Sequence, residues 1–180
     1  MNRLVAIVGL PGSGKSEVVK LFVDNGFERV YFGQLTMDKL IEENLEINEK
    51  NEKYMREKLR ADHGMAAYAK LNIPKIEKHH QDNHVAIDGL YSWEEYLILK
   101  ERFPHLEVLA VVSSPKTRYQ RLANRSVRPL TEVDAISRDH SQIENLNQGG
   151  PIAMADHIIH NQDSLENLTK TVLTFINEQN

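Results

Sequence analysis

The apolar residues of this chain follow two alternating patterns. Five short runs rich in apolar residues are typical of strands buried in a sheet: 4–8, 27–32, 85–87, 106–112 and 157–160. Between them lie longer stretches whose apolar residues recur three or four positions apart, as helices require. This alternation predicts an α/β fold, in which helices flank a five-stranded parallel sheet on both faces.

Capping and helix-breaking residues place the expected helices more closely. Capping boxes at 92–95 and 131–134 predict helices that run to about residues 102 and 146. Further helices are expected over 36–43, over 48–62 up to Gly64, and from Pro115. We expect Pro74 to interrupt or restart a helix that begins at 65, and 148–151 to break the chain. In the closing helix, the residues expected to be buried are Leu165, Leu168, Val172, Phe175 and Ile176.

The turn between the first strand and the first helix carries the most specific motif. It fits the pattern G-x-x-x-x-G-K-[ST] with Gly9, Leu10, Pro11, Gly12, Ser13, Gly14, Lys15 and Ser16. Backbone N–H groups of such a loop converge on phosphate oxygens, and the helix dipole adds partial positive charge. Lys15 is expected to reach the β- and γ-phosphates of ATP, and the Ser16 hydroxyl to bind Mg²⁺. The motif predicts a nucleotide-binding site.

Composition limits the partners of this site. The formal net charge of −4 and the lack of a basic stretch argue against a nucleic-acid partner. The chain has no cysteine, which excludes disulfides, and no apolar run of membrane-spanning length. We expect one cytoplasmic domain over residues 1–180, and the sequence does not define an oligomeric state.

These features together resemble the P-loop kinases of small phosphorylated metabolites, the nucleoside-monophosphate-kinase and dephospho-CoA-kinase group. The similarity is strongest to a poorly characterised branch of adenylate-kinase-related, dephospho-CoA-kinase-like proteins. Besides the loop, the shared residues are Leu59-Arg60, Gly64 to Ala67, Pro74 to Ile76, Ile87 to Gly89, Ser114 to Tyr119, Arg138-Asp139 and Ala155 to Ile159. The resemblance implies ATP and Mg²⁺ as cofactors and a small-molecule phosphate acceptor.

The chain departs from these relatives after its second strand. Many of them have an aspartate there that takes a proton from the acceptor hydroxyl, whereas this chain has Gln34. Glutamine is not a base. Either another carboxylate does this work, or the acceptor is already an anion, as in monophosphate kinases.

Several residues outside the loop are candidates for catalysis. Asp88 follows a buried strand, where its carboxylate either orients a Mg²⁺-bound water or only caps a turn. Arg125 and Arg128 lie in a segment that corresponds to the lid of related kinases, at about 125–137. Such arginines neutralise charge on a transferred phosphoryl group. Arg121 is expected to contact the nucleotide. Arg138 either completes the lid or pairs with the adjacent Asp139.

The acceptor is expected to bind a helical segment at about 34–80, where Arg60 is a candidate ligand for its phosphate. Ordinary helix packing also explains the small residues of this segment. Three functions remain open. A kinase of a small nucleotide-like or coenzyme-precursor acceptor fits best, ahead of a nucleotide-dependent ATPase or switch protein and of a kinase of polynucleotide ends.

Overall fold

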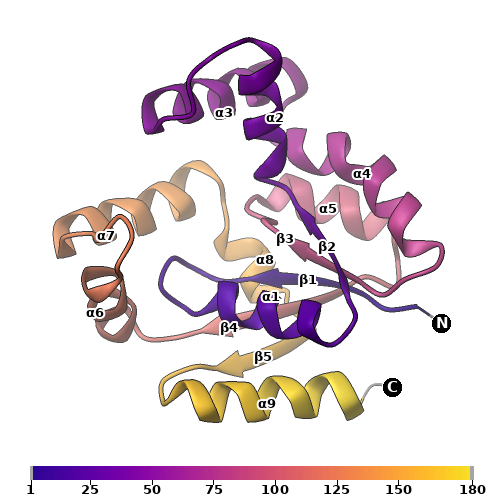
Figure 1. The fold of residues 1–180 in the computed structure, drawn as a ribbon, viewed down its shortest axis with the longest axis vertical. Helices are drawn as coiled ribbons and strands as arrows, with labels where there is room; N and C mark the ends of the chain where they lie inside the picture. Colours follow the sequence, from indigo (N-terminus) through magenta and orange to yellow (C-terminus); the bar gives the residue numbers. More distant parts are fainter. Residues whose placement is uncertain (1, 179–180) are drawn as a thin grey trace.

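The computed structural model describes residues 2–178 and contains the expected parallel sheet (Figure 1). Its strands are β1 (Leu4–Val8), β2 (Glu28–Tyr31), β3 (Val85–Asp88), β4 (Glu107–Val112) and β5 (His157–His160). They are ordered β2-β3-β1-β4-β5, and every pair of neighbours is parallel. The central strand β1 is buried along its whole length, as its unbroken apolar run predicts.

Helices cover both faces of the sheet. On one face, α1 (Lys15–Asp24) and α9 (Leu165–Glu178) enclose a core around Phe22 and Val172. On the other face, α4 (Ala67–His80), α5 (Trp93–Arg102) and α8 (Gly149–Ala153) pack over a larger core that includes Phe32, Ile87 and Leu99. The prediction of a parallel α/β sheet flanked by helices is confirmed.

The remaining helices lie beyond the end of the sheet at which the strands finish (Figure 1). They are α2 (Gln34–Glu42), α3 (Glu49–His63), α6 (Pro115–Asn124) and α7 (Glu132–His140), and a π-helical turn, η1 (Ser141–Asn145), follows α7. Both predicted capping boxes are present, at the starts of α5 and α7. Within the described residues, each helix is too short or too polar to cross a bilayer.

Two predicted interruptions are wrong. Pro74 lies inside α4, which continues from Ala67 to His80. A proline within a helix costs about 3 kcal/mol, but Tyr68 and Ile76, on either side of it, are both buried and hold the two halves in register. Residues 148–151 do not break the chain but begin α8, because Gln148 is fully buried and Gly150 packs closely against Trp93.

Two predicted helix properties also differ. The polar helix expected to reach residue 146 ends at His140, where a wider π-helical turn replaces it up to Asn145. Leu165 is 58% exposed rather than buried. It is the first residue of α9, and the buried stripe starts one turn later at Leu168 and continues through Val172 and Ile176.

Candidate functional site

The phosphate-binding loop joins β1 to α1 at the end of the sheet where the strands finish. Gly12 has a φ of 78°, and a Cβ atom there would lie 2.7 Å from the Arg118 carbonyl oxygen. Glycine is therefore required both by the left-handed conformation and by the close approach of α6. Gly14, with a φ of 99°, directly precedes the first turn of α1.

Side chains from other parts of the chain tie the loop carbonyls back to the protein. The hydrogen bonds are from Gln148 Nε2 to Gly9 O (3.3 Å), Lys15 Nζ to Leu10 O (3.3 Å), Arg118 Nη1 to Pro11 O (3.0 Å) and Asn161 Nδ2 to Ser13 O (2.8 Å). A carbonyl oxygen that faced a bound anion would repel it. The Ser13 N–H is used within the turn, where it donates to Leu10 O at 3.1 Å, and the N–H groups of Gly14, Lys15 and Ser16 stay available to an anion.

Lys15 carries the charge that the loop offers to a ligand. Burial lowers the pKa of Lys15 to about 8, and the negative charge of Asp88 opposes this shift. The Ser13 Oγ is buried without a hydrogen-bond partner among the described residues. An ammonium group with so little hydration and an unpaired hydroxyl both fit the binding of a polyphosphate. Ser16 is exposed beside them on α1, where its hydroxyl is available to a cation.

Asp88 ends β3, next to the loop. Its side chain is 12% exposed and forms an ion pair with Arg29 of β2. Arg29 Nε donates to Asp88 Oδ2 at 3.1 Å, and Nη2 donates to the same oxygen. The guanidinium also lies over the Tyr31 ring, 4.6 Å from its centroid. Asp88 is therefore more than a turn residue bonded to its own backbone.

A second, deeper ion pair joins α6 to α7. Arg118 binds Asp139 through two parallel hydrogen bonds, Nη1 to Oδ1 at 2.8 Å and Nη2 to Oδ2 at 2.6 Å. Both residues are buried, and Tyr119 adds a third donor to the Asp139 carboxylate at 2.9 Å. The alternative of a local Arg138–Asp139 pair is wrong, because consecutive helix residues point apart and Asp139 faces α6.

Arg121 lies where β4 and β5 end. Its Nη1 donates to Ser113 Oγ at 3.1 Å and to Asn161 O at 3.0 Å, and its Nη2 lies 3.3 Å from Asn161 Oδ1. Arg121 therefore supports Asn161, which in turn holds the loop through Ser13. Contact of Arg121 with a nucleotide stays a prediction.

A cleft of about 760 Å³ opens between the predicted acceptor segment, at about 34–80, and residues between 128 and 146. Its aromatic and apolar lining includes Tyr31, Tyr68, Tyr91, Met37 and Met65, and its charged lining comprises Glu49, Glu52, Lys53, Arg56, Glu57, Arg60, Arg128 and Arg138. In Figure 1, α3 and α7 stand on the two sides of this end of the molecule. The cleft thus brings together Arg60, which the sequence predicts to bind the phosphate of the acceptor, and Arg128, which it predicts to act on the transferred phosphoryl group.

The lid arginines differ in their surroundings. Arg128 has a positive φ of 51° and lies 3.5 Å from Glu49 and 3.6 Å from Glu52 across the cleft. Arg125 donates to the Arg128 carbonyl, and partial burial together with the charges of Arg138 and Arg128 lowers the pKa of Arg125. The segment therefore concentrates positive charge and already contacts α3.

Arg60 stacks on Tyr68, with its guanidinium carbon 5.2 Å from the ring centroid. Its Nε is buried with no hydrogen-bond partner among residues 2–178. Below it, Glu95 is fully buried, and burial raises the pKa of Glu95 to about 7 while Arg60 partly opposes the shift. Arg60 is thus a cation of the cleft wall whose donors are not all used.

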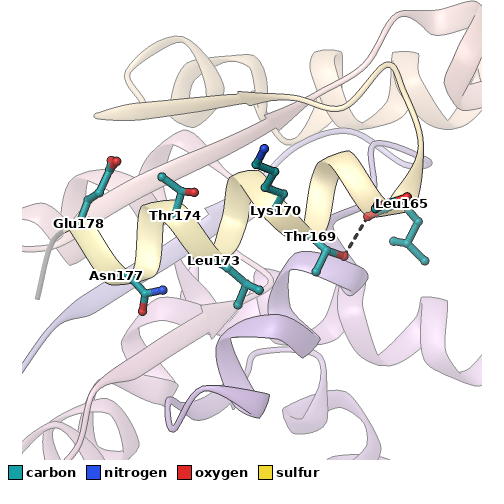
Figure 2. A pocket seen from close by; sticks show the side chains of 8 residues that line it. Leu165, Thr169, Lys170, Leu173, Thr174, Asn177 and Glu178 are labelled. Carbon is teal, nitrogen blue, oxygen red and sulfur yellow. Dashed lines mark hydrogen bonds between the residues drawn. The ribbon is translucent and has the colours of Figure 1, made fainter.

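A second hollow, on the outer face of α9, is lined by one helix alone (Figure 2). The figure shows its side chains spread along the helix from Leu165 to Glu178, with Leu173 between them. None of the loop or cleft residues lines it. Among the described residues, no three His, Asp or Glu side chains cluster closely enough to hold a metal by themselves.

The contacts of three residues at the site were not predicted from the sequence. Gln148 and Asn161 reach the loop from segments more than 130 positions away, at separations of 139 and 148 residues from their partners. Arg29 lies on β2, 59 residues from Asp88. The signal available for Arg29 was a charged residue within an otherwise strand-like run at the sheet edge.

The fold and the loop define the protein as a P-loop α/β protein. A family model described as an AAA domain matches residues 5–135. A UPF0200 protein of Thermococcus gammatolerans is 33% identical over 178 residues, which cover 96% of this chain and 93% of the relative. One of Sulfurisphaera tokodaii is 34% identical over 168 residues, covering 91% and 90%. The chain belongs to this AAA-domain family and to the UPF0200 proteins.

Solved structures extend the similarity in fold. TT1252 from Thermus thermophilus aligns with a TM-score of 0.66 at 18% identity, covering 99% of this chain and 98% of that one. A gluconokinase from Sinorhizobium meliloti has a TM-score of 0.60 at 14% identity and coverages of 98% and 93%. A shikimate kinase from Bacteroides thetaiotaomicron has a TM-score of 0.61 at 13% identity and coverages of 98% and 97%. The chain therefore shares its fold with these proteins, two of which are small-molecule kinases.

Proposed function

We propose that the protein is a phosphotransferase that moves the γ-phosphoryl group of ATP to a small nucleotide-like or coenzyme-precursor acceptor. The observation that carries this proposal is the loop itself. Its carbonyls are tied to protein donors, the N–H groups of Gly14, Lys15 and Ser16 remain for an anion, and the half-buried Lys15 supplies the charge. Fold similarity to a gluconokinase and a shikimate kinase supports a kinase over other P-loop proteins.

In this reaction, the bond between the γ-phosphorus and the β–γ bridging oxygen breaks, and a bond from the phosphorus to an acceptor oxygen forms. ADP leaves with the bridging oxygen, and any proton on the acceptor oxygen passes to a base or to water. Lys15 would stabilise the charge on the β- and γ-phosphate oxygens. Ser16 and Asp88 offer a hydroxyl and a carboxylate to Mg²⁺, which would neutralise phosphate charge when bound.

We further propose that the chain works as one domain with two segments that meet over the acceptor. The lid, at about 125–137, brings Arg125 and Arg128 to the transferred group, and Arg121 contacts the nucleotide. The acceptor segment, at about 34–80, holds an anionic group of the acceptor through Arg60. The 760 Å³ cleft suits a small molecule. Since Gln34 is no base, the proton of a hydroxyl acceptor would pass to another carboxylate or to water, and an anionic acceptor needs no base.

The test combines ligand-induced stabilisation with product formation. ATP with Mg²⁺ at about a hundred times its Kd should stabilise the protein by about 2.7 kcal/mol, and coenzyme precursors and nucleotides are then screened as acceptors by phosphorylated product. Lys15→Ala should abolish both responses, and Lys20→Ala, an exposed lysine on the same helix, should leave them intact.

The pH dependence gives an independent check on Lys15. Its ammonium deprotonates as the pH rises through about 8, so the affinity for ATP should fall above that pH in the unsubstituted protein and not in Lys15→Arg, whose guanidinium stays charged. ATP hydrolysis with no phosphorylated product from any acceptor would favour the ATPase or switch alternative. The absence of nucleotide binding would refute both functions.

A further inference from the structure

We infer that Arg29 is a positioning residue: it holds one oxygen of the Asp88 carboxylate so that the other is presented to the metal-binding side of the loop. This inference rests on the proposed function. The ion pair is asymmetric. Both donors, Nε and Nη2, go to Oδ2. Within residues 2–178, no hydrogen-bond donor reaches Oδ1.

The arrangement of the strands explains why Arg29 can do this. In the parallel register of β2 and β3, Tyr31 lies opposite Asp88 and Arg29 lies opposite Ala86. Val30 and Ile87 point into the core on one face of the sheet. Because side chains alternate along a strand, Arg29, Tyr31 and Asp88 share the other face, the one that α1 covers. The guanidinium therefore approaches Asp88 from the edge strand, along the sheet.

A platform keeps the guanidinium in place. Arg29 lies over the Tyr31 ring at 4.6 Å. The Tyr31 ring in turn packs so closely on Gly33 that any Cβ atom there would overlap it. This contact fixes the ring at the β2–α2 turn. The turn residues thus support the arginine that binds Asp88.

The charge of Asp88 is felt inside the loop. Among the charged groups that act on Lys15, Asp88 has the largest effect. A carboxylate held by Oδ2 alone keeps this proximity while leaving Oδ1 free for a metal-bound water. An ion pair that only joined the two strands would need neither the proximity of Asp88 to Lys15 nor a free Oδ1. If Arg29 only held β2 against β3, its loss would lower stability and leave the response to Mg²⁺ unchanged.

The experiment measures the affinity for a non-hydrolysable ATP analogue by calorimetry, with and without Mg²⁺. Arg29→Met should reduce the gain in affinity that Mg²⁺ provides by roughly tenfold, the scale on which partners of metal-site residues act. The affinity measured without Mg²⁺ should stay the same. Arg29→Lys, which keeps one charged donor, should restore part of the gain. Arg102→Met removes an arginine from an ion pair with Glu77 elsewhere and should change neither value.

A double-mutant cycle tests whether Arg29 acts through Asp88. Asp88→Asn should lose the Mg²⁺ gain by itself, and Arg29→Met added to it should have no further effect. Additive losses would overturn the inference, as would equal losses with and without Mg²⁺. Analogue binding that does not respond to Mg²⁺ in the unsubstituted protein would overturn the role of Arg29 alone. Failure to bind the analogue at all would overturn the proposed function as well.

Discussion

The phosphate-binding loop and the cleft wall use charged side chains in opposite ways. At the loop, long side chains donate to backbone carbonyls, and the Arg118–Asp139 pair behind it is buried and fully bonded. On the cleft wall, charged side chains pair with one another at 3.5–3.6 Å. Arg128, the lid member of these pairs, is 61% exposed.

This difference in bonding predicts that the loop keeps one conformation, whereas the charged side chains of the cleft wall change partners more easily. Hydrogen bonds to buried backbone groups are costly to break, because each leaves an unsatisfied polar atom. Exposed ion pairs contribute 1 kcal/mol or less and exchange readily with water or with a ligand. The loop is therefore pre-organised, whereas the pair between the exposed side chains of Arg128 and Glu49 exchanges readily with solvent.

The largest effect is expected behind the loop. Arg118→Met leaves the buried Asp139 without its cation and removes the donor to the Pro11 carbonyl. Breaking a buried pair in this way should lower the free energy of unfolding by about 3–5 kcal/mol. Chemical denaturation gives the value directly, and the thermal midpoint should fall by roughly 10 °C for a chain of this length.

Arg102→Met serves as the matched control, because Arg102 also joins two helices but is 59% exposed. Its cost should stay below about 1 kcal/mol. If Arg118→Met and Arg102→Met lowered the free energy of unfolding by similar amounts, the ion pair behind the loop would be no more important for stability than one on the surface. The contrast between the loop and the cleft wall would then be wrong.

A smaller effect, on catalysis alone, is expected from the lid. Arg125→Ala and Arg128→Ala should each lower kcat by about 10- to 100-fold, and by more than they raise the KM for ATP, because their charges act on the transferred group. The midpoint of unfolding should change little, since the pair of Arg128 with Glu49 is exposed and the buried Glu52 keeps a second partner in Arg56. Steady-state kinetics with an identified acceptor provides the measurement.

Glu57→Gln, on the same cleft wall and outside the Arg128 pairs, is the control for this change. A loss of stability in proportion to the loss of activity would mean that the lid arginines hold structure. The lid would then have to be sought elsewhere in the chain.

The same contrast explains what the sequence could predict. The loop motif, the five strands and both capping boxes are local patterns, in which neighbouring residues determine the outcome, and the structure confirms them. The partner of Asp139 and the continuation of α4 through Pro74 depend on residues that meet only after folding. No local spacing encodes the Arg29–Asp88 pair, because its register follows from the order of strands in the sheet.

The last expected effect depends on pH and concerns Glu95, the buried carboxylate near Arg60 of the cleft wall. Unlike Asp139, Glu95 has only half of its carboxylate bonded. Its Oε2 accepts from the Tyr91 and Ser92 N–H groups at 2.8 and 3.1 Å, and Oε1 has no partner among the described residues. Burial therefore dominates and raises the pKa of Glu95 from 4.5 to about 7. Between these two pH values the native state holds a proton that the unfolded state has lost, so the free energy of unfolding should fall as the pH rises through this window.

Glu95→Gln keeps an acceptor for both N–H groups but does not titrate. The free energy of unfolding of this variant should therefore fall less over pH 4.5–7 than that of the unsubstituted protein, by a few kcal/mol at most. Denaturation curves at several pH values measure this difference, with Glu101→Gln, an exposed residue of the same helix, as the control. If the free energy of unfolding changed with pH in the same way in all three proteins, Glu95 would ionise as freely as a surface glutamate. Its carboxylate would then be as well stabilised by its surroundings as that of Asp139 behind the loop.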